Sequence, residues 1–283
     1  KRLPSMYHQF KELANVDITK EAMEVGPAQH YVMGGVRVDA DSTQATVPGL
    51  FAAGEAAGGL HGSNRLGGNS LSDLLVFGRR AGLYAALYAK DFGGRLVVDS
   101  GQVEAVVREM LEPFERSRGE NPYAIQADLQ ETMQSLVGII RTESELRQAL
   151  VRIEALKERA KKARAEGGRV YNNGWHTALD LRSLLTVAEC SAVAALERKE
   201  SRGGHSREDH PYMDDEWGKV NIVVRLRNGA LQLKREPLPA IPEELKTLLK
   251  EQSWCRPSRC GCSAATRRAA ASRTIRSTPT RAW

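Results

Sequence analysis

The 283-residue chain lacks the features that mark membrane and secreted proteins. No apolar run approaches the roughly 20 residues that a bilayer-spanning helix needs, and residues 1–25 carry charges where a signal peptide would be apolar. We therefore expect a soluble, intracellular protein. Lys1 stands where an initiator methionine would, and the residues after it are typical of mid-protein sequence, so the pattern predicts a fragment whose natural start lies upstream.

Cysteine and metal-ligand clusters are also scarce. Three of the four cysteines, Cys255, Cys260 and Cys262, lie near the C-terminus with spacings that match no common zinc or iron–sulfur pattern. Cys190 falls within a helical pattern and is predicted to be a small packing residue. The histidines show no metal-ligand spacing, so the sequence predicts neither a disulfide framework nor a metal site.

Basic residues in excess are confined to one end of the chain. The net charge is +6, but residues 253–283 hold seven arginines and no acids, which leaves 34 basic against 35 acidic residues elsewhere. A near-neutral body argues against a nucleic-acid partner, because such binding depends on a basic face. The composition of 253–283 predicts a disordered tail. Out-of-frame translation is its favoured origin, and a basic interaction tail is the alternative.

What is present indicates an α+β protein. Short apolar runs punctuated by glycine between residues 30 and 59 predict strands of a buried sheet, followed by a glycine-rich loop at 58–68. Helical spacing follows, and its amphipathic runs predict an antiparallel bundle. Residues 220–226 and 230–233, separated by Arg227-Asn228-Gly229, predict a hairpin. The predicted helices cover 70–90, 101–115, 122–137, 143–165, 177–199 and 242–250.

Two polar side chains stand out in the glycine-rich part. Glu55 follows a predicted buried strand, where a carboxylate can accept hydrogen bonds from sugar-like hydroxyls, although a solvated turn glutamate is the simpler interpretation. Arg65 lies among five glycines immediately before a helix. Glycines let the backbone approach a ligand, and amides at a helix start attract negative charge. An arginine there could bind a carboxylate bidentately, which a lysine could not imitate.

Three consecutive motifs carry a family resemblance: HYVMGGV at 30–36, PGLFAAGE at 48–55 and HGSNRLGGNSL at 61–71. Together with ESRGGHSREDHP at 200–211, they resemble the succinate dehydrogenase/fumarate reductase flavoprotein family over about residues 1–250. The resemblance implies the C-terminal portion of a FAD-binding α/β domain, then an antiparallel helical bundle and a small C-terminal β-containing segment. The implied divisions are 1–29, the end of a substrate-capping domain, then 30–94, 95–200, 201–252 and the tail.

The resemblance also implies site residues and partners. His30 and Arg65 match the positions that hold the carboxylates of succinate or fumarate, and Glu55, Ser70 and Leu71 match positions that touch FAD. The implied reaction is hydride and proton transfer between succinate and FAD. Electrons would pass to an iron–sulfur subunit docked on membrane anchor subunits, on the cytoplasmic face of the membrane. For His205 and Arg207, we predict a structural network, with a partner contact as the alternative.

One departure from the family pattern changes the expected activity. The chain has no G-x-G-x-x-G fingerprint for the ADP half of FAD, and the segments in which the family carries its proton-relay arginine would lie upstream. We therefore expect the polypeptide alone to be inactive. Two alternatives stay open: a relative of L-aspartate oxidase, and a truncated product that acts only as a partner-binding module.

Overall fold

A computed structural model describes residues 4–23, 29–94 and 97–246. The chain divides into two units, residues 1–236 and 237–283. The α-helices are α1 (Pro4–Ala14), α2 (Asn69–Phe92), α3 (Ser100–Glu115), α4 (Pro122–Leu136), α5 (Glu143–Ala160) and α6 (Asn173–Glu197). The strands are β1 (Val36–Arg37), β2 (Ala57–Gly58), β3 (Ile140–Arg141), β4 (Ser206–Arg207), β5 (Val220–Arg227) and β6 (Ala230–Pro237).

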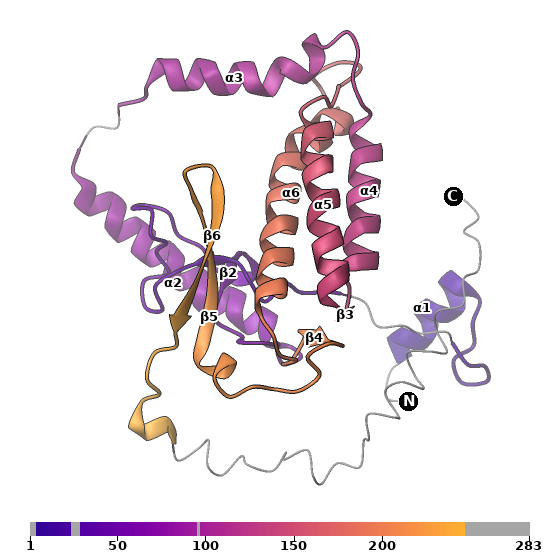
Figure 1. Cartoon of the computed structure of the whole chain (residues 1–283), viewed down its shortest axis with the longest axis vertical. Helices are drawn as coiled ribbons and strands as arrows, with labels where there is room; N and C mark the ends of the chain where they lie inside the picture. Colours follow the sequence, from indigo (N-terminus) through magenta and orange to yellow (C-terminus); the bar gives the residue numbers. More distant parts are fainter. Residues whose placement is uncertain (1–3, 24–28, 95–96, 247–283) are drawn as a thin grey trace. The chain divides into compact units, whose positions relative to one another are not determined.

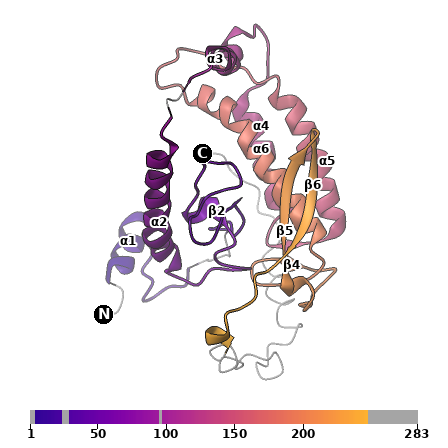
Figure 2. The same cartoon turned by 90° about the vertical axis from the view of Figure 1, so that its left-hand side faces the viewer.

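The hydrophobic core lies between α4, α5 and α6, which pack side by side as the sequence predicts (Figures 1 and 2). Each helix turns an apolar stripe inward, because its buried residues recur every three or four positions. The buried side chains are Ile125, Leu129 and Leu136 on α4, Leu146, Ile153 and Leu156 on α5, and Leu181, Leu185 and Ala192 on α6. The bundle therefore has three tightly packed helices, whereas α3 touches α6 mainly at its C-terminal end.

Side-chain caps fix where the three bundle helices begin. The Asn121 carboxamide oxygen accepts the Tyr123 amide at the start of α4, and Asn172 accepts the Trp175 amide at the start of α6. Thr142 and Glu145 form a reciprocal capping box at the start of α5. The Asn172 cap starts α6 at Asn173, four residues before the predicted Thr177.

The predicted helix over 143–165 is too long. Helix α5 ends at Ala160, because the chain then leaves the helix to pair with the segment before α4. The Glu120 amide donates to the Lys162 carbonyl, and the Arg164 amide donates to the Glu120 carbonyl, each at 2.9 Å. Backbone pairing with a distant segment thus ends this helix before the chain reaches Gly167 and Gly168, which the sequence suggests as its end.

The predicted buried sheet over residues 30–59 is wrong in extent. Within the described residues, β1 and β2 form a parallel pair only two residues long, and isolated bridges join Val38 to Ala45 and Gln44 to Phe51. Tyr31–Met33 forms no strand, and Val32 and Val36 are exposed. Alternating apolar residues and glycines predict a strand's faces, but a strand also needs a partner strand beside it to form a ladder, and the described residues around 30–59 supply such pairing only over short stretches.

Helix α2 agrees closely with its predicted range of 70–90. From the sequence, Gly78 and Gly82 within this helix suggest close packing against a neighbouring element. This prediction is wrong within the described residues, because a Cβ added at either glycine would meet nothing within 4 Å outside the helix's own backbone. Several large apolar residues of α2 are likewise exposed, among them Leu71, Leu75 and Leu83.

The C-terminal hairpin is confirmed and is longer than predicted. Strands β5 and β6 join through Asn228 and Gly229, which both have positive φ, as a two-residue type I′ turn requires (Figure 2). Residues 243–246 are helical, in agreement with the described part of the predicted helix 242–250. The predicted tail of 253–283 and its cysteines lie outside the described residues. Among the described helices, none combines the length and apolarity that crossing a bilayer requires.

Candidate functional site

The glycine-rich loop before α2 places Arg65 against an aromatic ring. The Arg65 guanidinium carbon lies 4.6 Å from the centre of the Tyr31 ring, which is a cation–π contact. One guanidinium nitrogen donates to the Leu66 carbonyl at 3.1 Å. The Nε atom is buried and has no hydrogen-bond partner among the described residues. Arg65 is therefore held by its flat face while part of its hydrogen-bonding edge stays unused.

The Tyr31 ring that contacts Arg65 is itself hydrogen-bonded to a buried aspartate. Asp73, on the second turn of α2, is 4% exposed, and its Oδ2 accepts a hydrogen bond from the Tyr31 hydroxyl at 3.2 Å. His61 Nε2 approaches the same oxygen at 3.2 Å, and the His61 ring stands edge-on to the Tyr31 ring. Burial, followed by the hydrogen bond and the charge of Asp73, raises the pKa of Tyr31. The phenol therefore stays protonated and remains a donor.

The predicted substrate residues come together only in part. His30 precedes Tyr31 in the chain, is exposed, and makes no hydrogen bond within the described residues. Since Tyr31 lies under Arg65, the structure brings the neighbour of His30, rather than His30 itself, into contact with the arginine.

The three residues predicted to touch the cofactor lie around the start of α2. Glu55 belongs to a 3-10 turn, Gly54–Ala56, rather than to the end of a buried strand, and its carboxylate accepts the Val32 amide at 2.9 Å. A Cβ at Gly54 would lie 2.7 Å from a Leu74 methyl, so this turn packs on α2. Ser70 and Leu71 form the first turn of α2, and Leu71 is 67% exposed.

These residues fit one side of a FAD site. Cβ atoms added at Gly62, Gly67 and Gly68 would meet nothing within 4 Å, so the loop backbone is open to a ligand. The Asn69 and Leu71 amides at the start of α2 already donate to the Leu66 and Gly68 carbonyls, each at 3.2 Å. Exposed Leu66 and Leu71 provide apolar surface for a ring system. Buried polar atoms without a partner, Arg65 Nε and Asp73 Oδ1, are further signs of an incomplete site in the described residues.

A second cluster of charged side chains follows α6. We call it the ionic network; its members are Arg141, Arg198, Glu200, Arg202, His205, Arg207 and Asp209. Glu200 is fully buried and accepts from Arg198, Arg202 and the Asp214 amide. Burial alone would raise the pKa of Glu200, but these hydrogen bonds outweigh it and lower the pKa. The carboxylate is therefore charged and paired.

Within the described residues, Arg207 and His205 belong to this network, in agreement with the structural role predicted for them. Arg207 is 1% exposed, forms a two-pronged pair with Asp209 at 2.7 Å, and donates to the Ala195 carbonyl at the end of α6. Hydrogen bonds from Arg207 hold the pKa of Asp209 far below its usual range. The buried Arg207 guanidinium, paired with the more exposed Asp209 carboxylate, thus closes the C-terminal end of α6.

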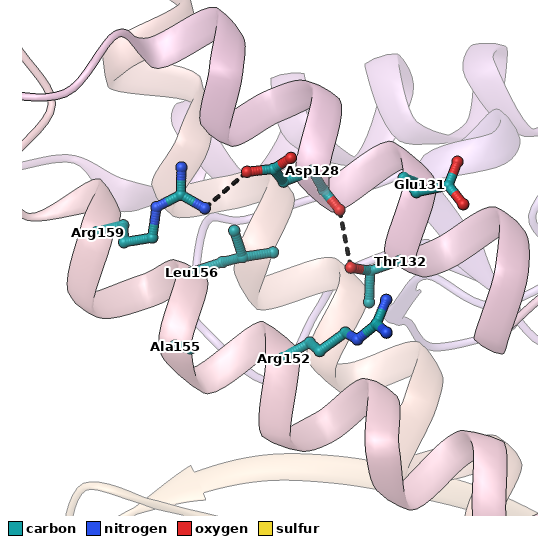
Figure 3. Close-up of a pocket in the computed structure, with 7 residues that line it drawn as sticks. All are labelled: Asp128, Glu131, Thr132, Arg152, Ala155, Leu156 and Arg159. Atoms are coloured by element: carbon teal, nitrogen blue, oxygen red, sulfur yellow. Dashed lines mark hydrogen bonds and ion pairs between the residues drawn. The ribbon is translucent and has the colours of Figure 1, made fainter.

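At two further places, a group of possible metal ligands and a surface groove, the charged side chains already pair within the protein. Glu143, Asp209 and His210 present ligand atoms within 4.8 Å of one another, but Arg147 and Arg207 already pair with the two carboxylates. On the bundle surface, a groove of about 260 Å³ lies between α4 and α5 (Figure 3). Asp128 and Arg159 on its rim bind each other at 2.7 Å, so they are not free for a ligand.

Comparisons with known protein families agree with this division of the chain. A family model described as a FAD binding domain matches residues 1–71, and one described as fumarate reductase flavoprotein C-term matches residues 126–252. The glycine-rich loop and the start of α2 fall within the FAD binding domain match, and the capped bundle falls largely within the flavoprotein C-terminal match. The chain belongs to the succinate dehydrogenase/fumarate reductase flavoprotein subunit family.

Relatives of known name show how much of that family the chain spans. It is 36% identical over 236 residues to the succinate dehydrogenase flavoprotein subunit of Coxiella burnetii, covering 79% of this chain and 40% of the relative. It is 37% identical over 239 residues to the fumarate reductase flavoprotein subunit of Escherichia coli, covering 82% and 40%. The chain therefore spans about 40% of the length of these curated relatives.

Solved structures give the same result. The Mycobacterium smegmatis Sdh1 complex in the apo form matches with a TM-score of 0.77 and 56% identity, covering 84% of this chain and 40% of that chain. An E. coli quinol fumarate reductase that carries a mutation in FrdA matches with a TM-score of 0.77 and 33% identity, covering 86% and 43%. The α+β fold class is therefore confirmed.

Sequence reasoning missed Tyr31, His61 and Asp73 as a unit around Arg65. A signal for Asp73 was present: it is the one charged residue among the apolar residues 71–77, and a carboxylate there is either exposed or paired. The contact of Tyr31 with Arg65 joins residues that are 34 positions apart, and no periodicity in the sequence reports it.

Proposed function

We propose that the chain is the C-terminal part of a flavoprotein subunit that transfers a hydride and a proton between succinate and FAD, giving fumarate. The observation that carries this proposal is the state of Arg65. It is held face-on by Tyr31 at the opening of α2, and the one side-chain hydrogen bond of its guanidinium within the described residues goes to the Leu66 carbonyl at 3.1 Å. A guanidinium presented in this way suits one carboxylate of a small dicarboxylate.

The other site residues have complementary roles in this proposal. His30 would bind the second carboxylate, since it is exposed and free of other hydrogen bonds within the described residues. Two charge-assisted anchors would fix the substrate's central carbons in one orientation. Glu55, Ser70 and Leu71 would contact FAD, which when bound supplies the hydride acceptor.

Partners, location and domain divisions belong to the same proposal. Relatives of this chain are named as subunits of succinate dehydrogenase and fumarate reductase, which supports an iron–sulfur subunit as electron acceptor and membrane anchor subunits beyond it. The protein would then be peripheral on the cytoplasmic face of the membrane. Residues 30–94 would complete a FAD-binding domain, and residues 95–200 and 201–252 would be its helical and C-terminal parts.

The test compares the complete gene product with residues 1–283 expressed alone. Flavin absorbance reports FAD retention, and dye reduction with succinate or L-aspartate reports the substrate. We expect the complete gene product to hold FAD and oxidise succinate, and the 283-residue chain alone to be inactive. Oxidation of L-aspartate instead would support the aspartate oxidase alternative. Absence of flavin from both proteins would favour the partner-binding module.

A matched pair of variants tests the residue that carries the proposal. Arg65→Lys keeps the positive charge but loses the planar fork, so we expect the KM for succinate to rise about tenfold or more with FAD retained. Arg79→Lys, at an exposed arginine of the same helix α2, is the control and should leave KM unchanged. An unchanged KM in Arg65→Lys would remove Arg65 from the substrate site.

A further inference from the structure

A tight turn in the ionic network touches the loop that carries Arg65. Residues 202–205 form this turn, which we call the bracing turn: the Arg202 amide donates to the His205 carbonyl at 2.8 Å, and the His205 amide donates to the Arg202 carbonyl at 3.0 Å. At its tip, the Gly204 amide donates to the Ser63 carbonyl at 2.9 Å. Ser63 lies two residues before Arg65, so the contact reaches the candidate substrate loop from 141 positions further along the chain.

The fit between turn and loop leaves no room for a side chain at one of the two glycines. A Cβ at Gly203 would lie 2.5 Å from the Ser63 carbonyl oxygen and 2.6 Å from the Ser63 hydroxyl. The φ of Gly203 is +58°, which also disfavours other residues. A Cβ at Gly204 would lie 3.6 Å from the same carbonyl, which is an ordinary contact. The backbone of the turn therefore approaches the loop closely at Gly203.

Side-chain hydrogen bonds hold the two ends of the bracing turn, Arg202 and His205. His205 Nδ1 accepts from Arg141 at 3.0 Å, and its Nε2 lies 3.2 Å from the Arg198 carbonyl. Arg202 is paired with the buried Glu200 and donates to the Asp214 carbonyl at 2.8 Å. His205 is thus tied to Arg141, between α4 and α5 in the chain, and to Arg198, which follows α6, while Arg202 is tied to Glu200 and Asp214. The tip of the turn meets the Ser63 backbone.

We propose that the bracing turn positions Arg65 for the substrate by holding the Ser63 backbone. This inference rests on the proposed function in that it assigns Gly203, Gly204 and His205 a positioning role for the dicarboxylate. The loop needs such support because Cβ atoms at Gly62, Gly67 and Gly68 would meet nothing within 4 Å, so its own residues constrain it little. Tyr31 fixes the guanidinium end of Arg65, and the bracing turn fixes the backbone end.

Three glycine variants separate the effect of the contact between Gly203 and Ser63 from the backbone strain of placing alanine at a positive φ. Gly203→Ala puts a methyl group into Ser63, whereas Gly204→Ala adds the same methyl group at an ordinary distance. Gly229→Ala, in the hairpin turn, carries a φ of +77° with open space around it, and so controls for the backbone cost alone. Each variant is made in the complete gene product.

The first measurement is amide hydrogen exchange of residues 61–68. We expect faster exchange there in Gly203→Ala, with α5 and α6 unchanged, and no change in Gly204→Ala or Gly229→Ala. His205→Asn, which loosens the turn without altering its glycines, should have the same effect to a smaller degree. If Gly203→Ala does not fold, His205→Asn decides the outcome. Unchanged exchange in the folded variants would overturn the proposal.

The second measurement is steady-state kinetics with FAD content. Displacement of a substrate anchor by about 1 Å can cost up to about 100-fold in rate, so we expect Gly203→Ala to lower kcat/KM for succinate by about tenfold or more, mainly through KM, with FAD retained. Faster loop exchange with unchanged KM would show a structural contact only and would overturn the positioning role. If the wild-type protein does not oxidise succinate, the proposed function fails, while exchange still decides whether the turn holds the loop.

Discussion

Single residues around Arg65 show how a surface loop can present a well-oriented cation. Arginine side chains lose rotamer freedom when they bind, and contact with a fixed ring reduces that cost in advance. Here the ring belongs to Tyr31, whose hydroxyl is tied to Asp73 at 3.2 Å. Asp73 in turn lies on α2, so the orientation of the Arg65 guanidinium depends on a regular element as well as on the loop.

The ring of Tyr31 is the part of this arrangement that we expect to matter for binding. Tyr31→Leu removes the cation–π contact, which typically contributes about 1 kcal/mol, and should raise the KM for succinate about fivefold in the complete gene product. Tyr31→Phe keeps the ring and should raise KM less. Equal effects of the two substitutions would show that the hydrogen bond to Asp73, rather than the ring, supports Arg65.

The residues of the site were predictable to different degrees. Arg65 stands out because it lies among five glycines immediately before a helix, whereas Glu55 is singled out by its family motif, since a solvated turn glutamate is the simpler interpretation of that residue alone. The surroundings of Arg65 were not predictable, because Tyr31, His61 and Asp73 meet only through the packing of a loop on α2. The same holds for Ser63 and Gly203, whose contact depends on the fold of the intervening residues.

At the scale of elements, the bundle helices are defined by local signals and the sheet is not. Helix α5 has a capping box at its start and buried residues at helical spacing, and both can be identified from the sequence. Its end was missed, because the Lys162 and Arg164 backbone pairs with Glu120, far away in sequence. The strands around β1 and β2 failed as predictions for a similar reason: a ladder needs partner edges that a local pattern does not specify.

The capping box gives a direct test of how much the start of α5 contributes to stability. Thr142→Ala removes the acceptor for the Glu145 amide and one partner of the Glu145 carboxylate, and should lower the free energy of unfolding by about 1 kcal/mol. Urea denaturation followed by circular dichroism measures it. Ser183→Ala, at an exposed position within α6, is the control and should change stability far less. A loss as small as that of the control would mean that the box is dispensable.

For the whole molecule, the ionic network makes stability depend on pH. Burial lowers the pKa of His205 from its ordinary 6.5 to about 4; its hydrogen bond to the Arg198 carbonyl opposes this, and the charges of Arg141, Arg207 and Arg198 add to it. The folded protein therefore keeps His205 neutral at a pH where the unfolded chain takes up a proton. Stability is highest above the unfolded pKa and falls as the pH drops from about 6.5 toward about 4.

This effect can be measured against a variant that lacks the imidazole. Between about pH 7 and about pH 5, the wild-type protein should lose about 2 kcal/mol of unfolding free energy through His205. His205→Asn should be less stable near pH 7 but should lose less over the same interval. Chemical denaturation at the two pH values gives the comparison. Equal losses in the two proteins would assign the acid sensitivity to other groups.

The long sequence separation between the bracing turn and the Arg65 loop has a consequence for the order in which the parts of the protein fold. Contacts within the bundle join neighbouring helices and can form early, whereas Gly204 meets Ser63 across 141 positions and Arg37 meets Glu236 across 199. During synthesis from the ribosome, the Arg65 loop therefore emerges long before its support exists. The dicarboxylate-binding geometry would mature last, after the chain beyond α6 has folded, so nascent chains would pass through a long interval without a competent substrate site.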